Sequence, residues 1–411
     1  MLSPIQKEIV ELPGNLIVRA SAGTGKTHTM VSKIEYDIAH CHTHKAVAAI
    51  TFTIKAAAEI KDRLTIDTSN HFIGTNNSFA IEEIIKPFMR DVFGKDYKLD
   101  MSTDYSVKVK TFTEGLSKVK DEQILCSYAN SKENFIFQLA LEILQKSKAC
   151  QLYLKAKYFK IYVDEYQDCD KDMHALFMYI CENLKIDTFV VGDEKQSIYM
   201  WRGAYPKAFM SIWGRDDFSK KFMRDNFRSC QQIQNYSNLL CDETRDLYKT
   251  VDDLSSVIVI CTATSNWVSS VTQHLDPDKK CALLRYSKAN AEAGAKALTD
   301  GNMEFTYIPQ TPISEITTDA KRIAITFHSS KGLEFEQVVL FVSDYRLSSE
   351  EDIYNHYVAA TRAKTKLILV YINGDWSAGQ FAKNINNILG KSGLKMKDVA
   401  TIVNCTECIN N

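Results

Sequence analysis

Two segments of the chain carry residues whose types and spacing suit phosphate chemistry. The first, ASAGTGKT, lies between the apolar run LIVR and the helix-like run THTMVSKIEYDIA. Gly23 and Gly25 allow backbone N–H groups to approach phosphate oxygens, and the start of a helix adds favourable partial charge. Lys26 is expected to reach the β- and γ-phosphates, and the Thr27 hydroxyl to bind Mg²⁺. The alternative, a glycine-rich turn without a ligand, is disfavoured by the strand–loop–helix setting. The expected phosphate-binding set is Ala20, Ser21, Ala22, Gly23, Thr24, Gly25, Lys26 and Thr27.

The second segment, KIYVDEYQDCD, places two adjacent carboxylates after an apolar run. Asp164 is expected to hold Mg²⁺, directly or through water. Glu165 is expected to orient and deprotonate the attacking water. Acidic residues at strand ends are often only solvated loop residues, but a phosphate loop in the same chain makes that alternative weaker. Together the two segments predict an enzyme that hydrolyses ATP with Mg²⁺.

The elements that position these residues are predicted from recurring short, β-branched apolar runs. The runs are LIVRA, AVAAITFT, KIYVDE, TFVVGD, VIVICTA, CALLRY, RIAITF, QVVLFV and KLILVYI. They are typical of strands buried on both faces of parallel sheets. Helix-like segments such as KAAAEIKDRL and ANAEAGAKAL lie between most of them, which indicates α/β architecture.

The pattern changes between residues 79 and 157, where it becomes helical and rich in aromatic residues. This predicts a helical insertion between two strands of the first sheet. Its aromatic residues are a candidate partner-binding surface; the alternative is that they pack the core of the insertion itself.

Bulk composition is that of a globular protein. Of 411 residues, 45% are hydrophobic and 25% charged, and the net charge of −1 gives no argument for nucleic acid. No apolar run approaches the roughly 18 residues needed to span a membrane, and the amino terminus does not resemble a signal peptide. The 11 scattered cysteines suit reduced thiols, so a cytoplasmic location is expected.

Two clusters that contain cysteine or histidine are candidate metal sites. HCHTH supplies His40, Cys41, His42 and His44, and a single CxxC supplies Cys405 and Cys408. Zinc ligands normally come as spaced pairs, so ordinary surface and core residues are the better interpretation.

Further motifs, in order along the chain, resemble those of the UvrD/Rep group of superfamily 1 helicases. They are TFTIKAAAEIKDRL (motif Ia), GTNNSF (Ib), VDEYQD (II), VVGDEKQSIYMWRGA (III), NFRS (IV), ITFHSSKGLEF (V) and YVAATRAK (VI). The resemblance covers the chain except the insertion and a few loops. It implies two RecA-like parallel-sheet domains of a P-loop NTPase. The expected first domain is 1–78 with 158–222, the insertion is 79–157, and the second domain is 223–411.

The resemblance also implies roles around the nucleotide. Gln196 would contact the γ-phosphate or the attacking water, and Arg228 and Arg362 from the second domain would stabilise the transferring phosphate. Gln6 matches the family's adenine-reading glutamine. Phe227 matches its adenine-stacking aromatic residue, and Glu334 its ribose contact. The expected catalytic set is Lys26, Asp164, Glu165, Gln196, Arg228 and Arg362.

A second group of motif residues is expected to contact DNA. Trp201 is a candidate platform for base stacking, with a buried core tryptophan as the alternative. Phe52 is a second stacking candidate with the same alternative, and His328 could equally be a satisfied interior histidine. Asn77 stands where many relatives have histidine, which leaves that contact open. The complete expected set is Phe52, Thr53, Lys55, Asn77, Tyr199, Trp201, Arg202, His328, Ser329 and Lys331.

A narrower resemblance, to the GajB helicase-like subunits of Gabija anti-phage systems, is carried by segments outside the general motifs. These include ENFIFQLALEILQKS in the insertion and YIPQTP near residue 310. The resemblance implies a hetero-oligomer with a GajA-like OLD-family Toprim nuclease, a role on phage DNA and no membrane partner.

The loop QTPISEITTDAK, residues 310–321, stands where larger UvrD-like helicases insert an accessory domain. A dozen residues cannot build a domain with its own core. We therefore expect a DNA-stimulated translocase, by resemblance a 3′–5′ helicase, that lacks this domain. The alternative is a regulatory subunit in which ATP and DNA ends license a nuclease without processive unwinding. A third alternative, a degenerate scaffold, is disfavoured because the residues expected to hydrolyse ATP are present.

Overall fold

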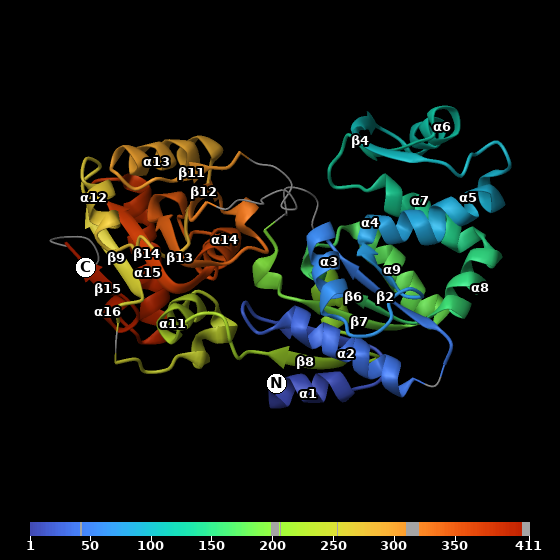
Figure 1. Cartoon of the computed structure of the whole chain (residues 1–411), viewed down its shortest axis with the longest axis horizontal. Helices are drawn as coiled ribbons and strands as arrows, with labels where there is room; N and C mark the ends of the chain where they lie inside the picture. The colour runs from blue at the N-terminus through green and yellow to red at the C-terminus, as the bar shows by residue number, and fades with distance from the viewer. Residues whose placement is uncertain (42, 199–204, 206, 253, 310–319, 405–411) are drawn as a thin grey trace. The chain divides into compact units, whose positions relative to one another are not determined.

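The computed structural model describes all 411 residues except 42, 199–204, 206, 253, 310–319 and 405–411. Two compact units are present, and each contains a parallel sheet covered by helices, as the fold class predicts (Figure 1). Unit 1 comprises Met1–Ser21 and Gly25–Met223, and unit 2 comprises Ala22–Thr24 and Arg224–Asn411. On the described residues, no helix is both long enough and apolar enough to cross a bilayer.

Unit 1 is built on a six-stranded sheet in the order β3-β2-β6-β7-β1-β8, and every pairing is parallel. The carboxyl ends of all six strands therefore lie along one edge of the sheet, where parallel α/β sheets place their ligands. The strands are β1 (Leu16–Ala20), β2 (Ala46–Thr51), β3 (Phe72–Thr75), β6 (Tyr158–Val163), β7 (Asp187–Gly192) and β8 (Ser219–Met223).

Helices cover both faces of this sheet, because alternate residues along each strand point to opposite sides. Leu16 and Val18 of β1 pack with the helices α1, α2 and α3, whereas Ile17 belongs to the core on the other face with α7 and α9. Burial on both faces explains why the strands have continuous apolar sequences. The helices are α1 (Pro4–Glu11), α2 (Lys26–His40), α3 (Ile54–Arg63), α7 (Phe135–Lys146), α9 (Lys171–Leu184) and α10 (Lys207–Trp213).

The segment between β3 and β6 is largely helical, as expected, but it also contains a two-stranded sheet, β4-β5, that the apolar pattern did not predict. Its first helix is continuous with a π-helical stretch, η1. The elements are α4 (Asn76–Phe79), η1 (Ala80–Ile85), α5 (Lys86–Phe93), β4 (Ser102–Val109), α6 (Phe112–Glu122), β5 (Ile124–Tyr128), α7 and α8 (Lys148–Lys157).

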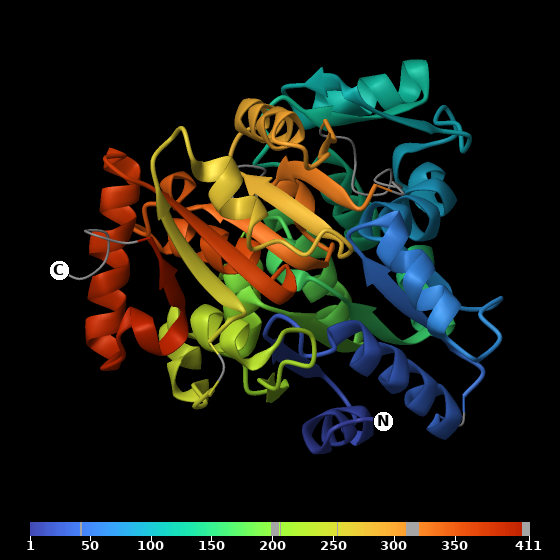
Figure 2. The same ribbon diagram turned by 60° about the vertical axis from the view of Figure 1, so that its left-hand side comes forward.

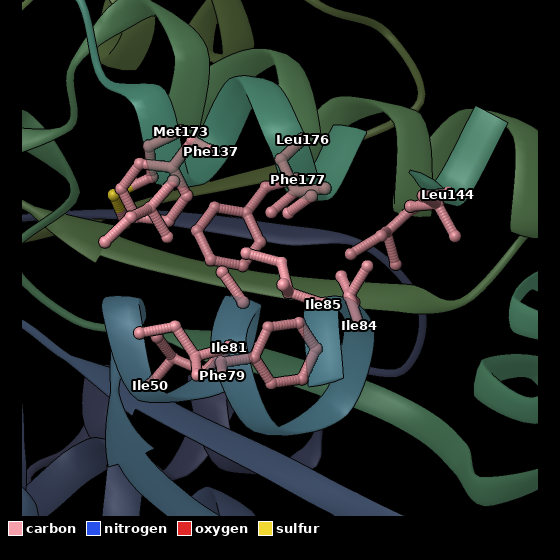
Figure 3. Packing of buried hydrophobic residues seen from close by; sticks show 14 of the residues in the cluster. Ile50, Phe79, Ile81, Ile84, Ile85, Phe137, Leu144, Met173, Leu176 and Phe177 are labelled. Atoms are coloured by element: carbon pink, nitrogen blue, oxygen red, sulfur yellow. The ribbon is translucent and has the colours of Figure 1, made fainter. Parts of the chain in front are cut away.

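Half of the aromatic side chains of this segment are buried, and most of the others are partly buried. Phe79, Phe135 and Phe137 are at most 1% exposed, and Figure 3 shows Phe79 and Phe137 among aliphatic side chains of η1, α7 and α9. The burial of these rings favours the alternative expectation, that the aromatic residues pack the core of the insertion itself. The reason is that apolar residues repeat with helical spacing along η1 and α7, so these rings face the neighbouring helix. Tyr105 of β4 differs, with 48% of its surface exposed.

Unit 2 is built on a seven-stranded parallel sheet in the order β11-β12-β10-β13-β14-β9-β15. The helices α12 and α13 cover one face, while α11 and α14 contact the other (Figures 1 and 2). The strands are β9 (Val257–Thr262), β10 (Cys281–Arg285), β11 (Thr306–Tyr307), β12 (Arg322–Thr326), β13 (Phe335–Phe341), β14 (Ala363–Ile372) and β15 (Thr401–Val403). The helices are α11 (Gln231–Leu239), α12 (Trp267–Thr272), α13 (Lys288–Asp300), α14 (Glu350–Ala360), α15 (Trp376–Ser392) and α16 (Met396–Val399).

Candidate nucleotide-binding and nucleic-acid sites

The glycine-rich loop connects β1 to α2 at the carboxyl edge of the first sheet. Gly23 (φ 76°) and Gly25 (φ 81°) both adopt left-handed backbone conformations that residues with a side chain rarely adopt. Gly25 directly precedes α2, so the first N–H groups of that helix are next to the loop. Lys26 is the first residue of the helix. This arrangement is suited to binding an anionic group such as a phosphate.

The two predicted carboxylates lie beside this lysine. Asp164 follows the last residue of β6 and is 4% exposed, and its carboxylate accepts a hydrogen bond from the Glu165 backbone N–H at 2.8 Å. The Lys26 Nζ atom lies 3.7 Å from Glu165 Oε1. Residues far apart in the sequence are thus gathered at one place, because β1 and β6 each end next to β7.

Burial determines the protonation of Asp164. Removal from water, followed by the neighbouring charge of Glu165, raises the pKa of Asp164 to about 7, and Lys26 counteracts this only in part. The carboxylate of Asp164 and the hydroxyl of Thr27 are hard oxygen donors of the kind that Mg²⁺ accepts alongside nucleotide phosphates. The side chains present therefore fit a magnesium–nucleotide complex. In the described parts of the chain, no group of three or more His, Cys, Asp or Glu residues could hold a metal by itself.

The backbone at Glu165 is strained. Its φ of 49° and ψ of 38° are left-handed, which is uncommon for a residue other than glycine and is often found at functional sites. The Gln167 side-chain amide donates to the Glu165 carboxylate from the following turn, η2 (Tyr166–Asp168). This hydrogen bond holds the carboxylate in place.

Gln167 also connects Glu165 to the next strand end. Its Oε1 accepts a hydrogen bond from the Asp193 N–H at 3.0 Å, and Asp193 Oδ2 accepts one from Gln196 Nε2 at 2.8 Å. A hydrogen-bonded path therefore runs from Glu165 through Gln167 and Asp193 to Gln196. Gln167 and Asp193 are not among the site residues expected from the sequence, although they lie inside motifs II and III.

Close packing of this path leaves no room for a side chain at Gly192, the last residue of β7. A Cβ atom there would lie 2.6 Å from Gln167 Oε1 and 3.0 Å from the Phe209 ring. Glycine is required at this position because the neighbouring side chains fill the space.

Gln6, the predicted adenine reader, is buried beside the phosphate loop. It lies on α1, where its Oε1 accepts a hydrogen bond from the Ser3 N–H at 2.8 Å and so completes a capping box. A Cβ atom on Gly25 would be 3.0 Å from Gln6 Nε2. The structure thus brings Gln6 next to the loop, although the two are separate in the sequence.

In unit 2, motifs IV, V and VI meet around Glu334. Its Oε1 lies 2.6 Å from Arg228 Nη2, and its Oε2 lies 2.9 Å from Lys364 Nζ. Burial by itself would raise the pKa of Glu334, but Arg228 and Lys364 together lower it below its usual value. Glu334 is therefore ionised and paired within unit 2.

Arg362 and Phe227 have contrasting surroundings. Arg362 is 2% exposed, and its Nε donates to the Val358 carbonyl oxygen at 3.0 Å, which fixes the guanidinium against the end of α14. Phe227 is 64% exposed, as an aromatic ring available for stacking would be.

The predicted DNA contacts in unit 1 cluster near the ends of β2 and β3. Thr53 caps α3 by accepting a hydrogen bond from the Ala56 N–H at 3.1 Å, and Lys55 is exposed in the first turn. Phe52 is partly buried against the main core of unit 1, which favours the core alternative for much of its surface. Asn77 donates from Nδ2 to the Tyr105 hydroxyl at 2.6 Å, a partner that the sequence did not indicate.

The predicted DNA contacts in unit 2 follow β12. Ser329 and Lys331 are 6% and 8% exposed, and the Ser329 hydroxyl lies 2.9 Å from the Thr326 hydroxyl. The His328 ring is partly buried and contacts Tyr286 edge-on at 5.8 Å between ring centroids. Several predicted positions lie outside the described residues. They are Tyr199, Trp201, Arg202, His42, Cys405, Cys408 and the larger part of the 310–321 loop.

Comparisons with known proteins identify the family of this chain. The family model for the UvrD/REP helicase N-terminal domain matches residues 2–135 and 108–215, and that for the UvrD-like helicase C-terminal domain matches residues 323–370. Gabija protein GajB of Bacillus cereus is 37% identical, over 90% of this chain and 96% of that protein. The chain belongs to the UvrD/Rep helicase family.

Other relatives within the UvrD/Rep family are longer. ATP-dependent DNA helicase Rep of Escherichia coli is 27% identical over 58% of this chain, and PcrA of Bacillus subtilis is 28% identical over 58%. The matched regions cover 43% of Rep and 39% of PcrA, so the chain spans less than half the length of either helicase. Membership of this family makes the chain a helicase-type enzyme that uses a nucleotide and a metal ion.

Proposed function

We propose that this chain is an ATP-dependent, DNA-stimulated translocase with 3′–5′ polarity that acts in anti-phage defence beside a GajA-like Toprim nuclease. The observation that carries the ATPase part is the meeting of Lys26, Asp164 and Glu165 at one sheet edge, with Gln196 joined to Glu165 through Gln167. The defence role and the nuclease partner are supported by the similarity to GajB along nearly the whole of both chains.

The proposed mechanism begins with ATP bound on the glycine-rich loop. Residues 20–27 hold the phosphates, Lys26 neutralises their charge, and Gln6, Phe227 and Glu334 contact the nucleoside. Bound Mg²⁺ would neutralise charge developing on the phosphate oxygens, held by Thr27 and Asp164.

Hydrolysis then requires an activated water. Glu165 takes a proton from the attacking water, and its place is fixed by the Gln167 amide. Gln196 orients the same water or the γ-phosphate. Arg228 and Arg362 stabilise charge on the transferring phosphate; this part of the proposal rests on the motifs that contain them.

For DNA binding, we propose that the motif residues outside the nucleotide site contact the nucleic acid. Exposed Lys55 attracts phosphate, while Asn77 and His328 lie at the ends of their sheets.

The domain boundaries are proposed from the same family resemblance. We propose 1–78 with 158–222 as the ATP-binding domain 1A, 79–157 as the insertion 1B, and 223–411 as domain 2A. Residues 308–321 join β11 to β12 and are too few for an accessory domain with its own core.

The small number of residues between β11 and β12 favours a second candidate function. In this reading the chain is a regulatory subunit that responds to ATP and DNA ends and activates the nuclease without processive unwinding. The observations in its favour are the short connection at 308–321 and the fact that the matched regions cover less than half of Rep and PcrA.

One experiment separates the two candidates. Phosphate release should be measured with and without single-stranded DNA, alongside strand displacement on a 3′-tailed duplex, with the chain alone and with its nuclease partner. The translocase proposal expects DNA to stimulate hydrolysis and displacement to occur at least with the partner. Strong DNA-stimulated hydrolysis without displacement in either condition would support the regulatory subunit instead.

A further inference from the structure

A buried ion pair joins β1 to the motif III turn, and no step of the proposed mechanism uses it. Arg19 lies in β1, immediately before the phosphate-binding set, and Glu194 opens the 3₁₀ turn η3 (Glu194–Gln196). Their side chains are only 11% and 9% exposed. Charged side chains this deeply buried require partners, so the two residues depend on each other in the folded state.

The pair has two-point geometry. Arg19 Nε donates to Glu194 Oε2 at 3.3 Å, and Arg19 Nη2 pairs with Glu194 Oε1. The guanidinium carbon also lies 5.1 Å from the Trp213 ring centroid and 5.2 Å from that of Phe222. A planar guanidinium held by a carboxylate and two aromatic rings has little freedom to move.

The position of Arg19 makes it a direct link between two functional segments. In the sheet it is paired with Gly192 of β7, and Glu194 follows two residues later. The strand that carries Arg19 also leads into the phosphate loop. If the η3 turn moved relative to that loop, the ion pair would therefore either break or move Arg19 together with the turn.

Other buried polar contacts fix the same turn. Lys195 Nζ lies 2.7 Å from Asp193 Oδ1, both side chains are 1% exposed, and Gln196 Nε2 donates to the other oxygen of Asp193. Asp193 in turn donates its N–H to Gln167. The turn is thus held on one side by the path from Glu165 and on the other side by Arg19.

The free energy of a buried ion pair indicates whether it contributes to stability or to geometry. Desolvation of two charges offsets most of their attraction, so a buried ion pair adds little net stability, whereas it can enforce one geometry. A contact of this kind is better suited to setting the orientation of a turn than to holding the fold together.

We propose that Arg19 is a positioning residue for ATP hydrolysis: through Glu194 it fixes the η3 turn and thereby the side chain of Gln196 relative to Lys26 and Glu165. This inference rests on the proposed ATPase function and deepens it. It assigns a role to two residues, Arg19 and Glu194, that lie outside the expected catalytic and phosphate-binding sets.

The test uses the full-length chain with saturating single-stranded DNA and separates kcat from KM for ATP. In R19L/E194L both charges are removed together, so no buried charge is left unpaired and the thermal midpoint should stay near that of the wild type. We expect kcat to fall by about 10-fold or more with KM within about twofold, the pattern of an interaction that matters in the transition state. R19K, which retains the charge but loses the two-point geometry, should give an intermediate kcat.

Coupling to Gln196 provides the second readout. If Arg19 acts through Gln196, adding R19L/E194L to Q196A should lower kcat no further, because the positioned group is already absent. The matched control is R63L, which removes an exposed arginine–glutamate pair in α3 of the same unit and should leave kcat unchanged.

Three outcomes would overturn the inference: wild-type kcat in R19L/E194L, a rise in KM without loss of kcat, or additive losses with Q196A. Failure of the underlying ATPase proposal is distinguishable. In that case the wild-type chain itself would show no more hydrolysis than K26A, whereas a failed Arg19 inference leaves the wild-type activity intact.

Discussion

At the scale of single residues, Glu165 combines two unusual properties. Its backbone is left-handed, and its carboxylate lies between the Lys26 ammonium and the Gln167 amide. A strained conformation persists only where the surroundings impose it. Here the surroundings are the buried Asp164, which accepts the Glu165 N–H, and the η2 turn that follows.

Replacing Glu165 by glutamine tests its proposed role as the base. E165Q retains the size of the side chain but cannot accept a proton, so kcat should fall by at least about 100-fold. Nucleotide affinity should change little, since Lys26 and the loop are untouched. Phosphate release and titration with a fluorescent ATP analogue measure the two quantities. E142Q, at a partly exposed glutamate of α7, is the control. Near-normal hydrolysis in E165Q would remove Glu165 as the base.

At the scale of elements, α14 is anchored in unit 2 by a buried histidine. His356 Nε2 lies 2.8 Å from the Tyr236 hydroxyl of α11, and the ring packs against Tyr345 and against Phe381 of α15. Burial lowers the pKa of His356 to about 3. The two titratable groups that face it, Tyr236 and Tyr345, are neutral in the acidic range because burial raises their pKa values.

This histidine should make unit 2 sensitive to acid. Because the folded-state pKa lies below the unfolded value of about 6.5, protonation favours the unfolded chain. The stabilisation from neutral His356 is complete above about pH 6.5 and is lost as pH falls toward 3, at up to about 1.4 kcal/mol per pH unit. Urea unfolding at pH 7, 6 and 5 should show a steeper loss for the wild type than for H356Q, which has no imidazole to protonate. Equal pH dependence in the two proteins would contradict this prediction.

At the scale of the whole molecule, the net charge of −1 means that DNA binding must depend on a few local cations. The candidates are Lys55, Arg202 and Lys331. Three phosphate contacts to a single strand predict a slope of about −2 in a plot of log affinity against log salt concentration.

Fluorescence anisotropy with a labelled oligonucleotide at several salt concentrations measures that slope. K55A should weaken binding to all sequences alike and reduce the slope by about 0.7, the contribution of one phosphate contact. K391A removes an exposed lysine of α15 and should leave both quantities unchanged. Affinity that does not vary with salt would show that DNA is not held mainly through its phosphates.

The sequence by itself determined the strands that have continuous apolar sequences, and the order of the motifs. All nine apolar runs are strands, because burial on both faces of a parallel sheet demands continuous apolar sequence, a signal that is local. Shorter or more polar strands gave no such signal, which is why β3, β8 and the β4-β5 pair were not predicted. The glycine-rich loop and the Asp164–Glu165 pair could also be predicted from the sequence, since each consists of adjacent residues.

Only the tertiary structure decided which distant side chains meet. The path from Glu165 to Gln196, the Arg19–Glu194 pair, the Asn77–Tyr105 hydrogen bond and the inward packing of Phe135 and Phe137 join separate elements. These contacts depend on strand order and on which face a helix buries. A single sequence encodes the apolar period of each element, but it does not state the neighbour against which that element will pack.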